Sequence, residues 1–228
     1  MWRSTCALAM VLVLQPAYGA ESLHLAPSGT VVSGSFELAG KVIPLPEGEF
    51  ILAAARIDEA RSVSVFLAQL DGQRLKSAVW ASTVLEPAAA RSNGVQAREW
   101  CVGENVLFRL DHAQGCLVVA RRDGSFGAAS TGIMQDAAAW LAYHDVALPV
   151  PVLIIARIER RELMRAAYAF NPWSYGCNRP SSQFVDSIAD WGKQVQRHFD
   201  DLVMGRRTEL ARYSSRIHQC ASALASTP

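Results

Sequence analysis

Apolar side chains alternate with polar or small ones through much of residues 30–122, with the period of two that is typical of β-strands. The segment SVSVFLAQL, residues 62–70, is followed by Asp71-Gly72 and then by a second strand-like segment that runs to about Thr83. An Asp-Gly pair favours a two-residue type I′ turn, in which both central residues have positive φ. We therefore expect a β-hairpin whose turn is Asp71-Gly72.

Further strands are expected on both sides of this hairpin. Residues 30–38 are rich in β-formers, and residues 41–57 contain a Pro-Glu-Gly turn at 46–48 between two apolar runs. The remaining signals up to residue 124 are short strands separated by turns, at 103–105 and 113–115.

The period then changes to that of a helix. Apolar residues share one face of a helix expected over 133–145, and Pro149 prevents its continuation. The residues on that face are Ile133, Ala137, Leu141 and His144. Residues 151–172 return to a strand pattern, with a charged turn at 159–162 between two apolar runs, which predicts a second hairpin.

The clearest helical pattern begins after Ser181-Ser182, a pair that can cap a helix N-terminus. Apolar residues recur there in steps of three and four, at Phe184, Ile188, Trp191, Val195, Phe199 and Leu202. Gly205 is suited to end this helix. A second helix is expected after it, with Leu210, Tyr213, Ile217, Cys220 and Leu224 on one face. The short link between the two predicts an antiparallel helical hairpin.

Strands grouped before helices predict the α+β class: an antiparallel β-sheet section, covered on one side and followed by a C-terminal antiparallel helical hairpin. We expect one exported domain over residues 20–228. Its parts are a β-rich section at 30–130, a helix and a β-hairpin at 131–172, and the helical hairpin at 181–224.

Residues 1–19 have the pattern of a secretory signal peptide. Arg3 supplies a positive charge, residues 7–14 form an unbroken apolar run, and small residues precede a cleavage site after Gly19. The run is too short to cross a bilayer, which takes about 20 apolar residues. No later segment is both long and apolar enough, so we expect a mature chain without a transmembrane segment.

Composition supports export and argues against one class of partner. Half of the residues are hydrophobic, so the chain can bury a substantial core. Loss of Arg3 reduces the 22 basic residues to 21, which balance the 21 acidic ones, so no charge excess attracts nucleic acid. Abundant Ala and the use of Arg in place of Lys suggest a GC-rich bacterial source, so a periplasmic or secreted location is expected.

Four of the five cysteines remain in the mature chain. An even number in an exported protein indicates two disulfides. We expect Cys101 to pair with Cys116 across a short loop between β segments, and Cys177 with Cys220 at the open end of the helical hairpin. The spacings typical of zinc ligands are absent, and we expect neither a metal site nor a cofactor.

The sequence contains no catalytic or phosphate-binding motif of familiar spacing, so whether the chain is an enzyme stays open. Asp111 and His112 are adjacent and, together with Ser125, would be the first candidates in a hydrolase. A turn pair and a surface turn are the simpler interpretations of the same residues.

One local stretch combines aromatic, amide and guanidinium groups: YAFNPWSYGCNRP, residues 168–180. Such groups are typical of recognition surfaces. The candidate ligand- or partner-binding residues in it are Tyr168, Phe170, Asn171, Trp173, Tyr175 and Arg179. The alternative is a structural connection from strand to helix whose rings cover the core.

The leading hypothesis is a non-enzymatic exported protein that binds an unknown protein partner or small molecule through residues 168–180. Two alternatives remain: a hydrolase with an unrecognised site, and a component of an envelope or secretion assembly that uses the exposed helix pair.

Overall fold

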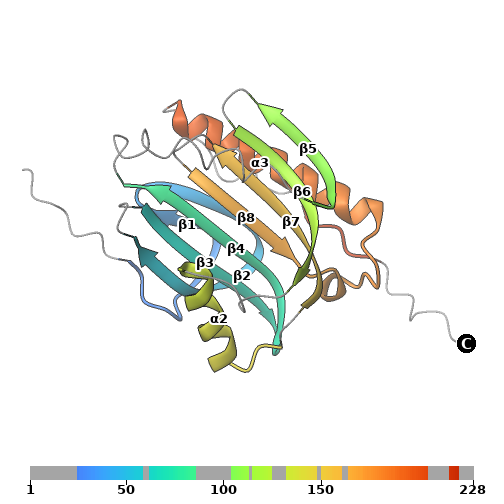
Figure 1. Ribbon diagram of the computed structural model, residues 1–228, viewed down its shortest axis with the longest axis horizontal. Helices are drawn as coiled ribbons and strands as arrows, with labels where there is room; N and C mark the ends of the chain where they lie inside the picture. Colours follow the sequence, from blue (N-terminus) through green and yellow to red (C-terminus); the bar gives the residue numbers. More distant parts are fainter. Residues whose placement is uncertain are drawn as a thin grey trace, which may run out of the picture.

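The computed structural model describes residues 25–58, 62–85, 104–112, 115–124, 132–147, 150–160, 164–204 and 216–220. Eight strands in these ranges form one antiparallel sheet in the order β1-β2-β3-β4-β8-β7-β6-β5 (Figure 1). The strands are β1 Val31–Leu38, β2 Lys41–Ile57, β3 Ser62–Asp71, β4 Arg74–Val84, β5 Val106–His112, β6 Gly115–Gly124, β7 Val150–Arg160 and β8 Met164–Phe170. The helices are α2 Ile133–Tyr143 and α3 Ser182–Val203, with a short 3-10 helix, η2, at Pro172–Tyr175.

The sheet consists of two four-stranded halves. Strands β1 to β4 follow one another in the first half, and β5 to β8 do so in the second. The halves are joined by antiparallel pairing of β4 with β8, where Trp80 lies opposite Ala167. Each half is built from neighbours in sequence, whereas the joint pairs residues far apart in the chain.

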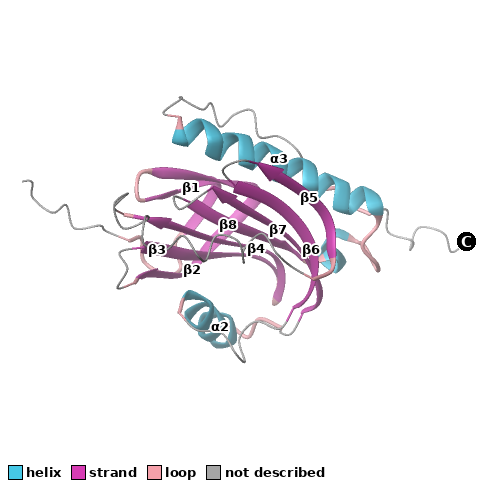
Figure 2. Ribbon diagram, turned by 45° about the horizontal axis from the view of Figure 1, so that its top comes forward, coloured by secondary structure: helices cyan, strands magenta, loops and turns pink. Residues whose placement is uncertain are grey.

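The sheet lies between the two α-helices (Figure 2). Helix α3 packs against β6 and β7 on one face, and α2 packs against β2 and β3 on the other. The expected mixed fold with an antiparallel sheet is therefore confirmed, but coverage on one side only was wrong. A helix packs on each face because strands such as β3 are apolar on both: Val65 and Leu67 belong to the core on the α3 face, and Phe66 to the core on the α2 face.

The long helix follows the predicted pattern closely. The side chain of Ser181 caps its N-terminus by accepting a hydrogen bond from the backbone N–H of Phe184 at 3.1 Å. Five of the six expected apolar positions are buried, and Leu202 is half-buried; the five are Phe184, Ile188, Trp191, Val195 and Phe199. Complete burial of a large apolar side chain contributes about 1.5–3 kcal/mol, so this face holds the helix on the sheet.

The second helix of the expected C-terminal hairpin is absent where the structure can test it. Residues 216–220, which include Ile217 and Cys220, are not helical. The remainder of that expected helix lies outside the described residues. The backbone N–H of His218 donates to Ser187 Oγ at 3.0 Å, and that of Cys220 donates to the Tyr175 carbonyl at 2.9 Å. Contacts with the folded domain thus replace the local hydrogen bonds of a helix.

The Pro-Glu-Gly sequence at 46–48 does not form the expected turn. Strand β2 continues through it and pairs with β1 before and after it, with a register shift between Ser33 and Ser35. Gly48 has a φ of 118°, which only glycine adopts readily. The Pro and Gly residues therefore bend a continuous strand at an irregular position in the sheet.

The β3–β4 hairpin is confirmed, with a turn that is shifted by one residue. Asp71 pairs with Arg74, so the loop residues are Gly72 and Gln73. Gly72 has a φ of 58°, whereas neither Asp71 nor Gln73 is among the residues with positive φ. A positive φ at the first central residue alone is typical of a type II′ turn, so the expected type I′ turn at Asp71-Gly72 was wrong.

Cys177 and Cys220 form a disulfide with a Cα–Cα distance of 5.1 Å, as expected from the sequence. Cys116 is buried and disulfide-bonded, but Cys101 lies outside the described residues, so its pairing stays a prediction.

The expected signal peptide, residues 1–19, also lies outside the described residues. In the described ranges, none of the helices combines the length and hydrophobicity needed to span a bilayer.

Candidate binding groove

The structure places the two aromatic residues at the end of β8 in the protein core. Tyr168 and Phe170 have no exposed surface. The Tyr168 hydroxyl donates a hydrogen bond to the Pro44 carbonyl at 3.0 Å, and burial raises the pKa of this tyrosine. These side chains connect β8 with β2 and α3 and have no surface to offer a ligand.

Asn171 is also structural, whereas Trp173 lies on the surface. The Asn171 amide donates to the Leu75 carbonyl at 2.9 Å, and its oxygen accepts from the Trp173 backbone N–H at 3.2 Å. It thereby attaches the start of η2 to β4. The Trp173 side chain is 59% exposed, and Arg179 is exposed as well. The six expected residues therefore do not form one surface.

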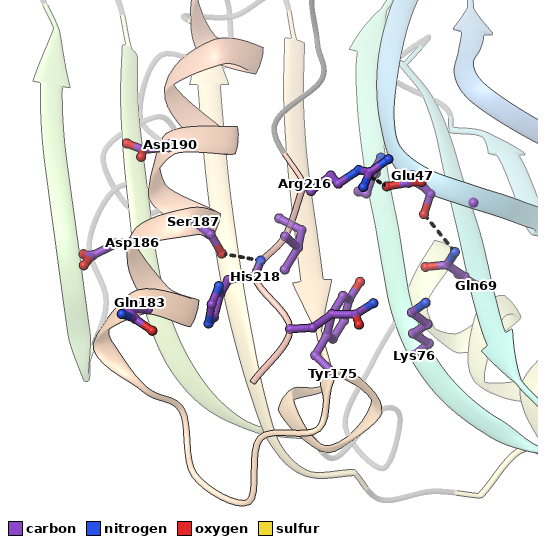
Figure 3. A pocket seen from close by; sticks show the side chains of 14 residues that line it. Glu47, Gln69, Lys76, Tyr175, Gln183, Asp186, Ser187, Asp190, Arg216 and His218 are labelled. Carbon is purple, nitrogen blue, oxygen red and sulfur yellow. Dashed lines mark hydrogen bonds and ion pairs between the residues drawn. The ribbon is translucent and has the colours of Figure 1, made fainter. Parts of the chain in front are cut away.

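The remaining candidate binding residue, Tyr175, borders a groove of about 870 Å³ between the sheet and α3 (Figure 3). One side is formed by the bend of β2 around Glu47, with Gln69 of β3 and Lys76 of β4 beside it. The other side is the first half of α3, and residues 216–219 run between the two sides. The volume lies within the usual range for small-molecule sites, about 300–1,000 Å³.

A hydrogen-bonded network fixes the β-sheet side of the groove. Gln69 Nε2 donates to the Glu47 carbonyl at 3.1 Å, and Gln69 Oε1 accepts from Ser77 Oγ at 2.6 Å. Burial raises the pKa of Tyr175 to about 12, and a hydrogen bond with Ser77 partly opposes that shift. Both polar side chains of this network, Gln69 and Ser77, are buried, and their hydrogen bonds hold them in one arrangement.

Residues 216–220, which we call the strap, form a wall of the groove. The strap is held by the Cys177–Cys220 disulfide and by the backbone hydrogen bonds of His218 and Cys220 described above. Arg216 adds an ion pair with Glu47 at 3.3 Å, in which both side chains are largely exposed. Exposed pairs contribute little to stability, so the disulfide is the main constraint on this wall.

Some charged side chains that line the groove form ion pairs, whereas Lys76 forms none within the described part of the chain. Asp190 is paired with Lys193 at 2.8 Å, and Glu47 is paired with Arg216. Asp186 and Asp190 point away from Lys76 in Figure 3. The Lys76 ammonium lies over the Tyr175 ring at 5.3 Å, and it has no carboxylate partner among the described residues. Lys76 is therefore the positive group available to a ligand.

The described ranges include the side chain of only one of the three hydrolase candidates, Asp111, so the hydrolase alternative stays a prediction. Both oxygens of Asp111 accept hydrogen bonds from Arg109 Nε, at 2.9 and 2.8 Å. The side chain of His112 and the whole of Ser125 lie outside the described residues. In the part of the chain that the structure describes, no three His, Cys, Asp or Glu side chains come together as metal ligands would.

Sequence reasoning missed most of the groove. Of the residues that line the groove, the sequence predicts only Tyr175 as a binding residue; it does not predict this role for Lys76, Gln69 or the strap. A signal was present for Gln69, because a glutamine in an otherwise apolar strand segment needs a buried hydrogen-bonding partner. No comparable signal existed for Lys76, whose role depends on its position over a ring from a distant element.

Comparisons with protein-family models, with curated proteins and with solved structures found no match to this chain.

Proposed function

We propose that the protein is an exported, non-enzymatic binding protein, periplasmic or secreted, that holds a small polar ligand in this groove. The observation that carries the proposal is the construction of the groove. A hydrogen-bonded network supports one side, a disulfide-linked strap supports another, and the volume of about 870 Å³ suits a small molecule. Rigid support of this kind reduces the entropy that a binding site loses when its ligand binds.

The lining indicates the chemistry of the ligand. The amides of Gln183 and Gln219 line the groove and have no hydrogen-bond partner among the described residues. Amides both donate and accept, and they suit a ligand with several hydroxyl groups. Lys76 adds one positive group. The ligand class that fits is a hydroxyl-rich molecule with one negative charge, such as an acidic sugar.

Calorimetric titration of the mature protein tests this proposal. Glucuronate and galacturonate represent the acidic sugars, and glucose and galactose are their neutral counterparts. We expect binding of an acidic sugar that is at least tenfold tighter than binding of its neutral counterpart. Lys76→Gln should remove that preference, because a charged hydrogen bond contributes about 1.5–3 kcal/mol.

Arg74→Gln is the matched control, since Arg74 is an exposed cation on the same strand and does not line the groove. It should bind like the wild type. Equal affinity for acidic and neutral sugars, or unchanged binding by Lys76→Gln, would contradict the assignment of Lys76. Absence of binding by all four sugars would contradict the ligand class.

A protein partner is the second candidate function, and the exposed Trp173 side chain favours it. Large exposed aromatic side chains are enriched at the centres of protein interfaces. A photo-reactive amino acid at position 173 should give one discrete cross-linked product in the cell envelope. The same group at Tyr143, which is 83% exposed on α2, should give none. Equal cross-linking at both positions would argue against an interface at Trp173.

A further inference from the structure

The face of the sheet that α2 borders carries four arginines in the second half of the sheet. Alternation along the strands places Arg122 on β6, Arg157 on β7, Arg165 on β8 and Arg109 on β5 on this face. Arg157 lies opposite Val118 on one side and Ala167 on the other, and Arg109 lies opposite Val118 in the same row. Arg122 lies opposite Leu153, which belongs to the core on the α2 side.

Two carboxylates on the same face are already engaged by two of these arginines. Glu159, which is 2% exposed, accepts a hydrogen bond from Arg165 Nε at 3.0 Å. Asp111 accepts from Arg109 Nε through both of its oxygens. In the described part of the chain, no carboxylate forms an ion pair with Arg122 or Arg157.

Arg157 is the more confined of the two unpaired arginines. Its Nε atom is buried and has no hydrogen-bond acceptor. Burial lowers the pKa of Arg157, and the positive charge of Arg122 lowers it further. Arg122 lies on the same face of the neighbouring strand, four positions away along it. A half-buried guanidinium with no ion-pair partner is unfavourable, because buried charges are normally paired.

We propose that Arg122 and Arg157 form a binding site for an oxyanion, a phosphate or carboxylate group, on this face of the sheet. Two guanidinium groups on adjacent strands present planar sets of N–H donors, which match the oxygens of such a group. The bound anion supplies the negative charge that the described chain lacks there. This site is distinct from the groove, which involves other side chains beside α3.

Thermal unfolding of the mature protein with added phosphate tests the site. The melting temperature of the wild type should rise by about 5–10 °C at a phosphate concentration one hundred times Kd, relative to potassium chloride of equal ionic strength. Acetate and citrate, tested in parallel, distinguish a carboxylate-binding site from a phosphate-binding one. A response to any of these oxyanions supports the site, and a response to none overturns it.

Arg157→Gln should lose this response, and Arg121→Gln should keep it. Arg121 is an exposed arginine on the same strand as Arg122, opposite Ile154 of the core on the α3 face, so it controls for a general effect of positive charge. Arg122→Gln is a second test at an exposed position, where folding is not at risk, and it should weaken the response at least tenfold in Kd.

The stability of Arg157→Gln without added oxyanion separates binding from a structural role. The variant should melt at the same temperature as the wild type or higher, because it removes an unpaired, half-buried charge. A melting temperature several degrees lower, together with an unchanged phosphate response, would show that Arg157 is structural and would overturn the proposal. Equal phosphate responses in all variants would also overturn it.

Discussion

At the scale of single residues, Gly48 and Gln69 explain why strand β2 continues through residues 46–48 with a bend and does not form the expected turn there. Gly48 combines a φ of 118° with a close approach to Gln69: a Cβ atom there would lie 1.9 Å from Gln69 Nε2. Gln69 uses the same Nε2 atom to bond the Glu47 carbonyl. The bend and the network beside the groove therefore depend on each other.

Gly48→Ala should destabilise the protein by about 2–4 kcal/mol, because it adds backbone strain to a steric clash. Urea denaturation measures the loss. Gly29→Ala is the matched control, since Gly29 has a φ of 92° with no atom within 4 Å of an added Cβ, so it reports strain alone. Combining Gly48→Ala with Gln69→Ala should reveal coupling of about 1 kcal/mol or more, whereas additive losses would argue against the clash.

His198 links α3 to β2, and we expect its contribution to stability to depend on pH. The side chain is fully buried on α3, and its Nε2 forms a 2.9 Å hydrogen bond with the Val42 carbonyl. Burial lowers the pKa of His198, although that hydrogen bond and Asp201 oppose the shift. The unfolded chain therefore takes up a proton more readily than the folded one. The stabilisation that neutral His198 contributes is fully present above the ordinary histidine pKa of about 6.5, and it is lost as pH falls through the folded pKa.

His198→Gln should reduce this loss of stability between pH 7.5 and pH 5. Urea denaturation at the two pH values gives the comparison. Phe199→Leu, at the next position of α3, provides a control that removes no titratable group: it should lower stability at both pH values and leave the loss between them as in the wild type. Identical pH dependence in the wild type and His198→Gln would assign the effect to other groups.

At the scale of elements, the strap is held to the domain mainly by one covalent bond. Replacing Cys177 and Cys220 together by Ser should destabilise the protein by about 4 kcal/mol, as the simple chain-entropy model gives for a loop of this length. The strap should become accessible to proteases, and ligand affinity of the groove should fall, while the sheet stays folded. Denaturation, limited proteolysis and calorimetry measure the three effects. Unchanged affinity would show that the strap is not part of the binding site.

A second disulfide involves Cys116 of β6, in the other half of the sheet. Cys116 on β6 is buried and disulfide-bonded, and we expect Cys101 as its partner. Peptide mapping without reductant should give a linked pair of peptides that contain Cys101 and Cys116. A linked peptide that joins Cys116 to Cys6 would exclude this pairing and also cleavage after Gly19.

At the scale of the whole molecule, the Cys177–Cys220 disulfide and the disulfide-bonded Cys116 fit a location outside the cytoplasm. N-terminal sequencing of protein from the periplasm or medium of a bacterial host should therefore begin Ala20-Glu21-Ser22. A mature chain that begins at Met1 would contradict both the signal peptide and the expected oxidising compartment.

Local periodicity and capping determined much of the fold in advance. The period of two predicted the strands, and the steps of three and four predicted α3 with its buried face and its Ser181 cap. The even number of cysteines indicated disulfides, and the pairing of Cys177 with Cys220 was predicted, although from a helical hairpin that was wrong in part. These features can be predicted from the sequence because strand and helix periods, caps and hairpin turns depend on residues that are close together in the chain.

Only the tertiary structure decided how these elements meet. Pairing of β4 with β8 brings Trp80 opposite Ala167, and no local pattern specifies that contact. The apolar residues of 216–220 matched a helix, yet contacts with Tyr175 and Ser187 hold this segment in a non-helical strap. The groove exists only after the two halves of the sheet have joined, and Arg122 and Arg157 share a face only after β6 has paired with β7. Function was therefore the least readable from sequence, because it depends on side chains that only long-range pairing brings together.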